Sequence, residues 1–134
     1  MDILEIVSLT LWWGEGTKSR RDVRWKSAVT YPIEITNTNP LIHKIFLEYL
    51  SLHTNVEKSR IHVQLQIHEN DNIDELEKYW RDELGIPKES YQKTIIRKIG
   101  NKPGKTMGTC KVRFADKSTY IMLQSKLEDL QDLI

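Results

Sequence analysis

The chain has 134 residues, of which 39% are hydrophobic and 29% are charged, and its formal net charge at pH 7 is +1. This length suits one domain with a hydrophobic core of its own and excludes two, so we expect a single domain over residues 1–134. The net charge is close to zero, so any attraction to nucleic acid must come from local clusters of charge.

The single cysteine, Cys110, excludes a disulfide framework within the chain and a cysteine-based zinc site. The first residues, with Asp2 and Glu5, lack the positive charge of a signal peptide, and the apolar stretch after them is too short to span a bilayer. We therefore expect a soluble, non-secreted protein without membrane contact. It would be cytoplasmic, or would lie in an organellar matrix if the host is eukaryotic.

Residues 2–14 are predicted to form the first helix, with Asp2 as its N-cap and Gly14 and Gly16 as its stop. Its residues 6–13 are apolar on every side apart from two small polar side chains. Because a helix without a polar face has no side suited to water, we expect this helix to be buried all round.

Glu15 follows this helix in a glycine-rich turn, which is an unusual place for a carboxylate. The C-terminal end of a helix dipole is already negative and therefore disfavours another negative charge. A bound Mg²⁺ would relieve the repulsion, because hard divalent ions take carboxylate and carbonyl oxygens as ligands. The alternative is an ordinary surface acid.

Two alternating stretches, 22–26 and 31–36, predict a hairpin. Asn39 and Pro40 then form a strong helix start, with Asn as N-cap and Pro in the first turn, and this helix is expected to end near His53.

The clearest predicted strand is 60–68, where apolar and polar residues alternate strictly. One face should pack on a core, and the other should stay open. The inward residues are Ile61, Val63, Leu65 and Ile67, and the outward residues are Arg60, His62, Gln64, Gln66 and His68.

The rest of the chain predicts an acidic amphipathic helix at 72–84, strands at 93–99 and 109–114 joined by the loop 100–108, and a last helix at 116–131. The class is therefore α+β. We expect an αββαββα two-layer sandwich in which an extra helix is inserted between the later strands. The helices should cover one face of an antiparallel sheet and leave the other face open.

The charges are strongly segregated along the chain. Acids gather in 69–83, whereas only Asp22 and Glu89 oppose the cations of two other segments. These cations are Lys18, Arg20, Arg21, Arg24 and Lys26, and then Lys88, Lys93, Arg97, Lys98, Lys102, Lys105, Lys111 and Arg113. The pattern is typical of a phosphate-binding surface or of a merely solvated sheet face. A two-stranded ribbon fits the DNA major groove, where Arg and Lys read guanine and Gln reads adenine.

Other motifs in the sequence have simpler interpretations. Residues 100–106 resemble a P-loop, but the motif is one residue short and is followed by a strand where a P-loop needs a helix. His62 and His68 share a strand face but lack a nearby third ligand, so a metal site there is not favoured. His43 and His53 are expected at the surface, and no Ser-His-Asp or Cys-His arrangement is evident.

Residues 9–16, Leu-Thr-Leu-Trp-Trp-Gly-Glu-Gly, resemble the LAGLIDADG motif of homing endonucleases in its WGEG variant. The predicted order of elements also resembles that fold. Residues 35–42 resemble a segment that is common after the first hairpin in this family. Trp80 with residues 83–87, then 93–94 and 108–113, resemble a bacterial and archaeal branch of single-motif members. The chain departs from the family at Thr10, where glycine is usual, and at Glu15, where aspartate is commoner.

The resemblance implies a homodimer in which two motif helices pack together through Val7, Thr10, Leu11 and Gly14. Each helix would bring Glu15 to the dimer axis, where the two acids and backbone carbonyls such as that of Gly14 would hold Mg²⁺ or Mn²⁺. A basic residue would assist catalysis. The candidates for it are Lys93, Lys98 and Lys111.

The implied activity is that of an intron-encoded homing endonuclease, a hydrolase that cuts double-stranded DNA at a specific site without a small-molecule cofactor. The expected DNA-binding residues are Lys18, Arg20, Arg21, Arg24, Lys26, Arg60, His62, Gln64, Gln66, Arg97, Lys102, Lys105 and Arg113. Two alternatives stay open. One is a DNA- or RNA-binding protein that does not cut, either a regulator or an intron maturase, and the other is a structural dimerisation module.

Overall fold

The computed structural model describes residues 1–16, 20–21, 29–98 and 107–134, with only the backbone at 20–21 and 29–30. In this part of the chain the helices are α1 (Ile3–Glu15), α2 (Pro40–His53), α3 (Ile73–Leu84) and α4 (Lys117–Asp132). The strands are β1 (Arg20–Arg21), β2 (Val29–Thr30), β3 (Pro32–Asn37), β4 (His62–His68), β5 (Ile95–Arg97) and β6 (Thr109–Ala115). Single turns of 3₁₀ helix lie at Lys58–Arg60 and Lys88–Ser90.

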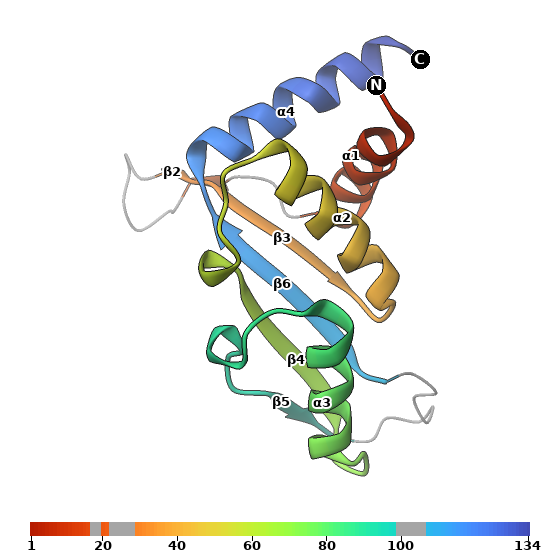
Figure 1. Ribbon diagram of the computed structural model, residues 1–134, viewed down its shortest axis with the longest axis vertical. Coiled ribbons are helices and arrows are strands. Elements are labelled where there is room, and N and C mark those ends of the chain that lie inside the picture. The colour runs from red at the N-terminus through yellow and green to blue at the C-terminus, as the bar shows by residue number, and fades with distance from the viewer. Residues whose placement is uncertain (17–19, 22–28, 99–106) are drawn as a thin grey trace.

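The fold is α+β, with a mixed sheet of four strands in the order β3-β6-β4-β5 (Figure 1). β3 and β4 each pair antiparallel with β6, whereas β5 pairs parallel with β4. The expectation of an antiparallel sheet was therefore wrong at this edge. The chain leaves β4, crosses through α3 and returns in the same direction, and such a helical crossover is what parallel pairing requires.

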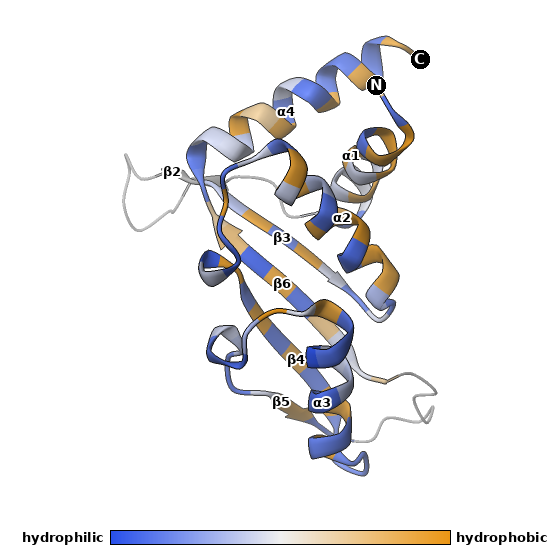
Figure 2. Cartoon of the chain, viewed as in Figure 1, coloured by the Kyte–Doolittle hydropathy of each residue, from blue (hydrophilic) through white to orange (hydrophobic). Residues whose placement is uncertain are grey.

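The helices cover one face of this sheet, and the core lies between them and the sheet (Figure 1). Hydrophobic and hydrophilic residues alternate along β4 and β6 in Figure 2, as the period of two predicts. The buried residues of the three longer strands are Ile33, Ile35, Val63, Leu65, Ile67, Cys110, Val112 and Phe114. The predicted inward faces of 60–68 and 109–114 are thus confirmed.

The predicted helix ends are confirmed at several positions. Asp2 caps α1, and its carboxylate accepts a hydrogen bond from the backbone N–H of Glu5 at 2.8 Å. Asn39 caps α2 in front of Pro40. Gly85 follows α3 in the left-handed region with φ of 64°, a conformation that costs glycine little.

The expectation that α1 is buried all round was wrong for the single chain. Its buried residues are Glu5, Ser8, Leu9 and Trp12, which form one face. On the opposite side Ile3, Ile6 and Trp13 are 81%, 38% and 47% exposed. Residue type misled the prediction, because the polar Ser8 and Glu5 lie on the buried face while large apolar residues face outward.

Glu5 joins α1 to two other helices. Tyr49 of α2 donates a hydrogen bond to its carboxylate at 3.4 Å. His53 Nδ1 and Lys126 Nζ each lie 4.0 Å from the same carboxylate, which is 8% exposed. Burial, followed by the charge of Glu5, raises the pKa of Tyr49 to about 12, so this phenol stays a hydrogen-bond donor.

His43 was expected at the surface but is buried, which corrects that prediction. Its Nε2 lies 3.4 Å from the backbone oxygen of Asn37, and its ring meets Trp80 of α3 edge to face at 5.9 Å. The inserted helix α3 covers this side of α2, and the sequence pattern of α2 alone does not reveal that cover.

Two of the sequence predictions fall where the structure says little. The strand predicted at 22–26 and the loop residues 100–106 lie outside the described residues. Of the described helices, none has the length and apolar character needed to cross a membrane.

Candidate functional site

The face of the sheet that the helices leave uncovered has polar and charged side chains on its three longer strands. The strand register places Gln64 of β4 opposite Lys111 of β6, and His62 opposite Arg113. The full set on these strands is Glu34, Thr36, His62, Gln64, Gln66, His68, Thr109, Lys111 and Arg113. This surface, which we call the open face, offers hydrogen-bond donors and acceptors at strand spacing.

Two interactions fix side chains on the open face. Lys111 Nζ lies 3.5 Å from the carboxylate of Glu34 on the neighbouring strand β3. Gln64 Nε2 donates a hydrogen bond of 3.0 Å to the backbone oxygen of Lys93. The sequence analysis did not include Glu34 in the site, although the alternation of 31–36 places it outward.

One end of the open face is hollowed to a volume of about 510 Å³. Its lining includes Arg60, His62 and Arg113, three of the predicted DNA-binding residues, together with Gln92, which the sequence analysis missed. The structure therefore brings two arginines, a histidine and the amide of Gln92 into one concave surface. A concave surface of this kind concentrates the positive electrostatic field of the arginines.

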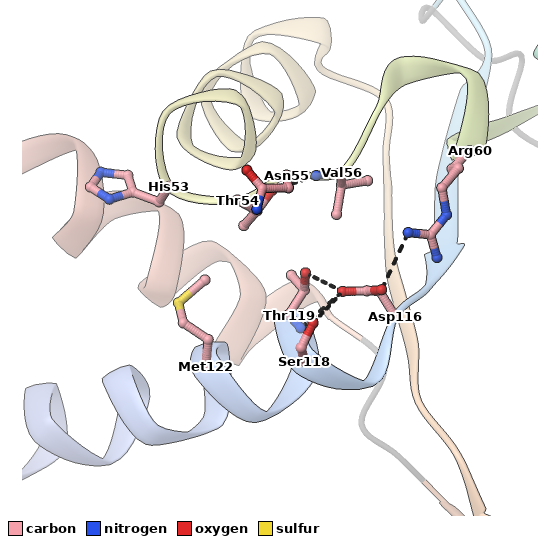
Figure 3. Close-up of a pocket in the computed structure, with 9 residues that line it drawn as sticks. All are labelled: His53, Thr54, Asn55, Val56, Arg60, Asp116, Ser118, Thr119 and Met122. Carbon is pink, nitrogen blue, oxygen red and sulfur yellow. Dashed lines mark hydrogen bonds and ion pairs between the residues drawn. The ribbon is translucent and has the colours of Figure 1, made fainter.

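Arg60 also has a structural role, which Figure 3 shows beside a smaller hollow of about 250 Å³. Its guanidinium donates to Asp116 Oδ1 at 3.3 Å and to the backbone oxygen of Ala115 at 2.9 Å. Asp116 caps α4, and its other oxygen accepts from the N–H and hydroxyl of Thr119. These Thr119 hydrogen bonds, with Ser118 and Arg60 after them, lower the pKa of Asp116.

Glu15 lies at the C-terminal end of α1, exposed to solvent. The next residue, Gly16, forms an antiparallel bridge with Ile35 on the outer edge of β3. A Cβ on Gly16 would collide with the backbone oxygen and the indole ring of Trp12, so the chain itself requires glycine there. The turn thus holds Glu15 beside the edge of the sheet.

The strand order distinguishes the three candidate lysines. Thr36 follows Ile35 in β3 and lies opposite Lys111, so Lys111 is one strand from the edge where α1 ends. Lys93 and Lys98 flank β5, three strands from β3, or roughly 14 Å at about 4.8 Å per strand. Topology therefore favours Lys111.

Two of the four predicted dimer residues, Thr10 and Gly14, are exposed on α1. A Cβ on Gly14 would meet nothing within 4 Å, so nothing in the described part of the chain requires glycine there. Thr10 is exposed, and its hydroxyl donates to the backbone oxygen of Ile6 at 2.7 Å, which leaves the hydroxyl satisfied within its own helix. Val7 is half-buried, as is the fourth residue, Leu11.

The donors at the end of α1 suit a hard divalent ion but make up only half of a site. The carboxylate of Glu15 and the carbonyl of Gly14 are oxygen ligands of the kind that Mg²⁺ and Mn²⁺ take. Among the described residues, no three His, Cys, Asp or Glu side chains gather closely enough to hold a metal ion. The oxygen set fits the ion only if a second copy supplies the same groups.

The remaining predicted DNA-binding residues are only partly described. Arg97 of β5 lies opposite His68 and is exposed. For Arg20 and Arg21 the structure gives the backbone in β1 alone, and Lys18, Arg24, Lys26, Lys102 and Lys105 lie outside the described residues.

Comparisons with protein-family models, with curated proteins and with solved structures found no match to this chain.

Proposed function

We propose that this chain is a site-specific DNA endonuclease of the LAGLIDADG type that acts as a homodimer with Mg²⁺ or Mn²⁺. The order of the elements supports this fold. β4 and β6 pair antiparallel as the second hairpin would, with α3 and β5 inserted between them, and the helices lie on the face away from the open one.

The observation that carries the proposal is the exposed apolar face of α1, which ends at an exposed acid. Ile6 and Trp13 are large apolar side chains exposed to water, and no packing contact in the described part of the chain requires glycine at position 14, between Trp13 and Glu15. A second copy packed on this face would bury the apolar residues and bring the two Glu15 carboxylates together. Thr10 enters such an interface without an unsatisfied hydroxyl.

In this dimer each residue has a separate role. The two Glu15 carboxylates and the Gly14 carbonyls would hold the ions, which supply water activation and stabilisation of the leaving oxygen. Lys111 would place a positive charge near the scissile phosphate from the strand next to β3. The open face would lie along the major groove, where His62, Gln64 and Arg113 face base edges.

The test is cleavage of a randomised duplex library by the full chain with Mg²⁺, followed by sequencing of the cut ends. We expect staggered cuts at one roughly palindromic site, with Mn²⁺ able to replace Mg²⁺. Glu15→Gln should keep duplex affinity and reduce cutting to the level seen with a chelator, because it removes one anionic metal ligand from each chain.

The matched control is Glu89→Gln, which alters an exposed acid in the 3₁₀ turn before β5. This variant should cut as well as the wild type. Full activity in Glu15→Gln would refute the catalytic role of this acid.

A second candidate is a DNA- or RNA-binding protein on the same scaffold that does not cut. The ion pair between Lys111 and Glu34 favours it, because the carboxylate neutralises the candidate lysine that, of Lys93, Lys98 and Lys111, lies nearest to the end of α1. Salt-dependent duplex binding without cleavage in either Mg²⁺ or Mn²⁺ would select this candidate.

A further inference from the structure

A hollow of about 400 Å³ lies between α3 and the segment 91–96, on the helix side of the sheet edge. We call it the α3 hollow. One side is the stripe of Ile73, Glu77 and Arg81 along α3, which is separate from the stripe that α3 buries in the core. Lys88 and Lys93 line the opposite side.

The summed charge of the side chains that line the α3 hollow is positive. Arg81, Lys88 and Lys93 face it, and Glu77 is its one carboxylate. None of these three cations forms an ion pair with a residue that the structure describes. An anionic ligand would supply the missing counter-charge.

The α3 hollow connects to the open face through Gln92. This residue lines both the α3 hollow and the hollow that contains Arg60, His62 and Arg113. The backbone N–H of Gln92 donates to the oxygen of Val63 in β4 at 2.7 Å, so the segment between the two hollows is fixed to the sheet. A polyanion that runs off the open face at this edge meets the second basic hollow next.

The outer surface of α3 restricts the approach to the α3 hollow. Asp74, Glu75 and Asp82 are exposed on this helix and repel a polyanion that comes over it. The favourable path is therefore past Gln92 along the sheet edge, where Lys88 and Lys93 are exposed.

We propose that the α3 hollow binds a phosphate group, and that this phosphate belongs to DNA which continues from the open face past the β5 edge. The source of the phosphate rests on the proposed function, whereas the phosphate site itself does not. In this proposal Lys93 contacts the phosphate backbone of the DNA and is not the catalytic lysine. This role agrees with its distance from the end of α1.

The experiment has two arms, both with the full chain. In the first, fluorescence anisotropy measures duplex affinity over a series of salt concentrations for the wild type, Lys93→Gln, Lys88→Gln/Lys93→Gln and the control Lys78→Gln. Lys78 is an exposed lysine of α3 outside the hollow. In the second arm, inorganic phosphate is titrated into ¹⁵N-labelled wild type and the double variant, and amide shifts are followed at residues 92–96.

We expect Lys93→Gln to reduce the slope of log affinity against log salt by about 0.9, and the double variant by about twice that. Lys78→Gln should keep the wild-type slope. Phosphate should shift the amides of 92–96 in the wild type and not in the double variant. Both lysines are exposed, so thermal melts of the variants should match the wild type.

The arms separate the two claims. Phosphate shifts with an unchanged duplex slope would keep the site and overturn DNA as its source. Phosphate shifts in a protein without any duplex affinity would keep the site while the proposed function fails. Duplex binding with an unchanged slope and no phosphate shift would overturn the site and leave the proposed function standing. The absence of both duplex binding and a phosphate shift would overturn both.

Discussion

At the scale of single residues, the two glycines that flank Glu15 are subject to different physical demands within this molecule. Gly16 has no room for a side chain, because a Cβ would collide with Trp12 of its own helix. Gly14 has open space around it and lies within α1, where glycine costs roughly 1 kcal/mol relative to alanine. No contact in the described part of the chain offsets this loss of helix stability at Gly14, which points to a neighbour outside the chain.

These demands predict opposite effects on folding. Gly14→Ala should raise the free energy of unfolding of the single chain by up to about 1 kcal/mol, because alanine favours the helix. Gly16→Ala should lower it, because Trp12 must move from a fully buried position. Urea unfolding measured at a protein concentration low enough to keep the chain monomeric checks both. A loss of stability in Gly14→Ala would show that its own chain needs this glycine.

The site residues that could be identified from the sequence were those fixed by local pattern. Strict alternation placed His62, Gln64 and Arg113 on one face, and the structure confirms that placement. Gln92 and Glu34 were missed for different reasons. Gln92 lies in a segment without periodicity, and Glu34 meets Lys111 only through the pairing of β3 with β6, which no local pattern encodes.

At the scale of elements, local signals predicted the helices well and long-range pairing poorly. The caps at Asp2, Asn39 and Gly85 are set within a few residues of the helix they end, so the sequence reveals them directly. The parallel pairing of β5 depends on where α3 returns the chain, and no local pattern encodes it. The predicted exposure of His43 was wrong for the same reason, because Trp80 of another helix covers its ring.

The contact between α2 and α3 predicts a dependence of stability on pH. Burial lowers the pKa of His43 below its ordinary value of 6.5, so the unfolded chain takes up a proton more readily than the folded chain. The free energy of unfolding is therefore fully retained above about pH 6.5. It should fall below that pH, by up to about 1.4 kcal/mol per pH unit, until the lower pKa of the folded chain is reached.

Urea unfolding between pH 7.5 and 5 tests this dependence. His43→Gln should flatten the acid side of the curve, whereas His53→Gln, an exposed position on the same helix, should leave it close to wild type. An unchanged acid slope in His43→Gln would assign the effect to another group.

At the scale of the whole molecule, the open face and the end of α1 differ in whether one copy of the chain completes them. Under the proposed function, the open face would bind DNA as a single chain, because its residues converge from β3, β4 and β6 within one copy. The end of α1 in one chain is not enough to hold a metal ion. Among the described residues it presents one exposed acid, Glu15, and the apolar face beside it is exposed to water. We therefore expect DNA binding and DNA cutting to be separable, with only the cutting dependent on the proposed dimer.

The central claim is that α1 pairs with α1 of a second copy, and sedimentation equilibrium of the wild type and Gly14→Ala tests it most directly. At micromolar concentration the wild type should sediment at twice the 15.8 kDa mass of the chain. Gly14→Ala should shift toward the monomer, because a methyl group would separate closely packed helices. A wild type that stays at 15.8 kDa up to about 100 μM, or a Gly14→Ala dimer of unchanged affinity, would contradict the account.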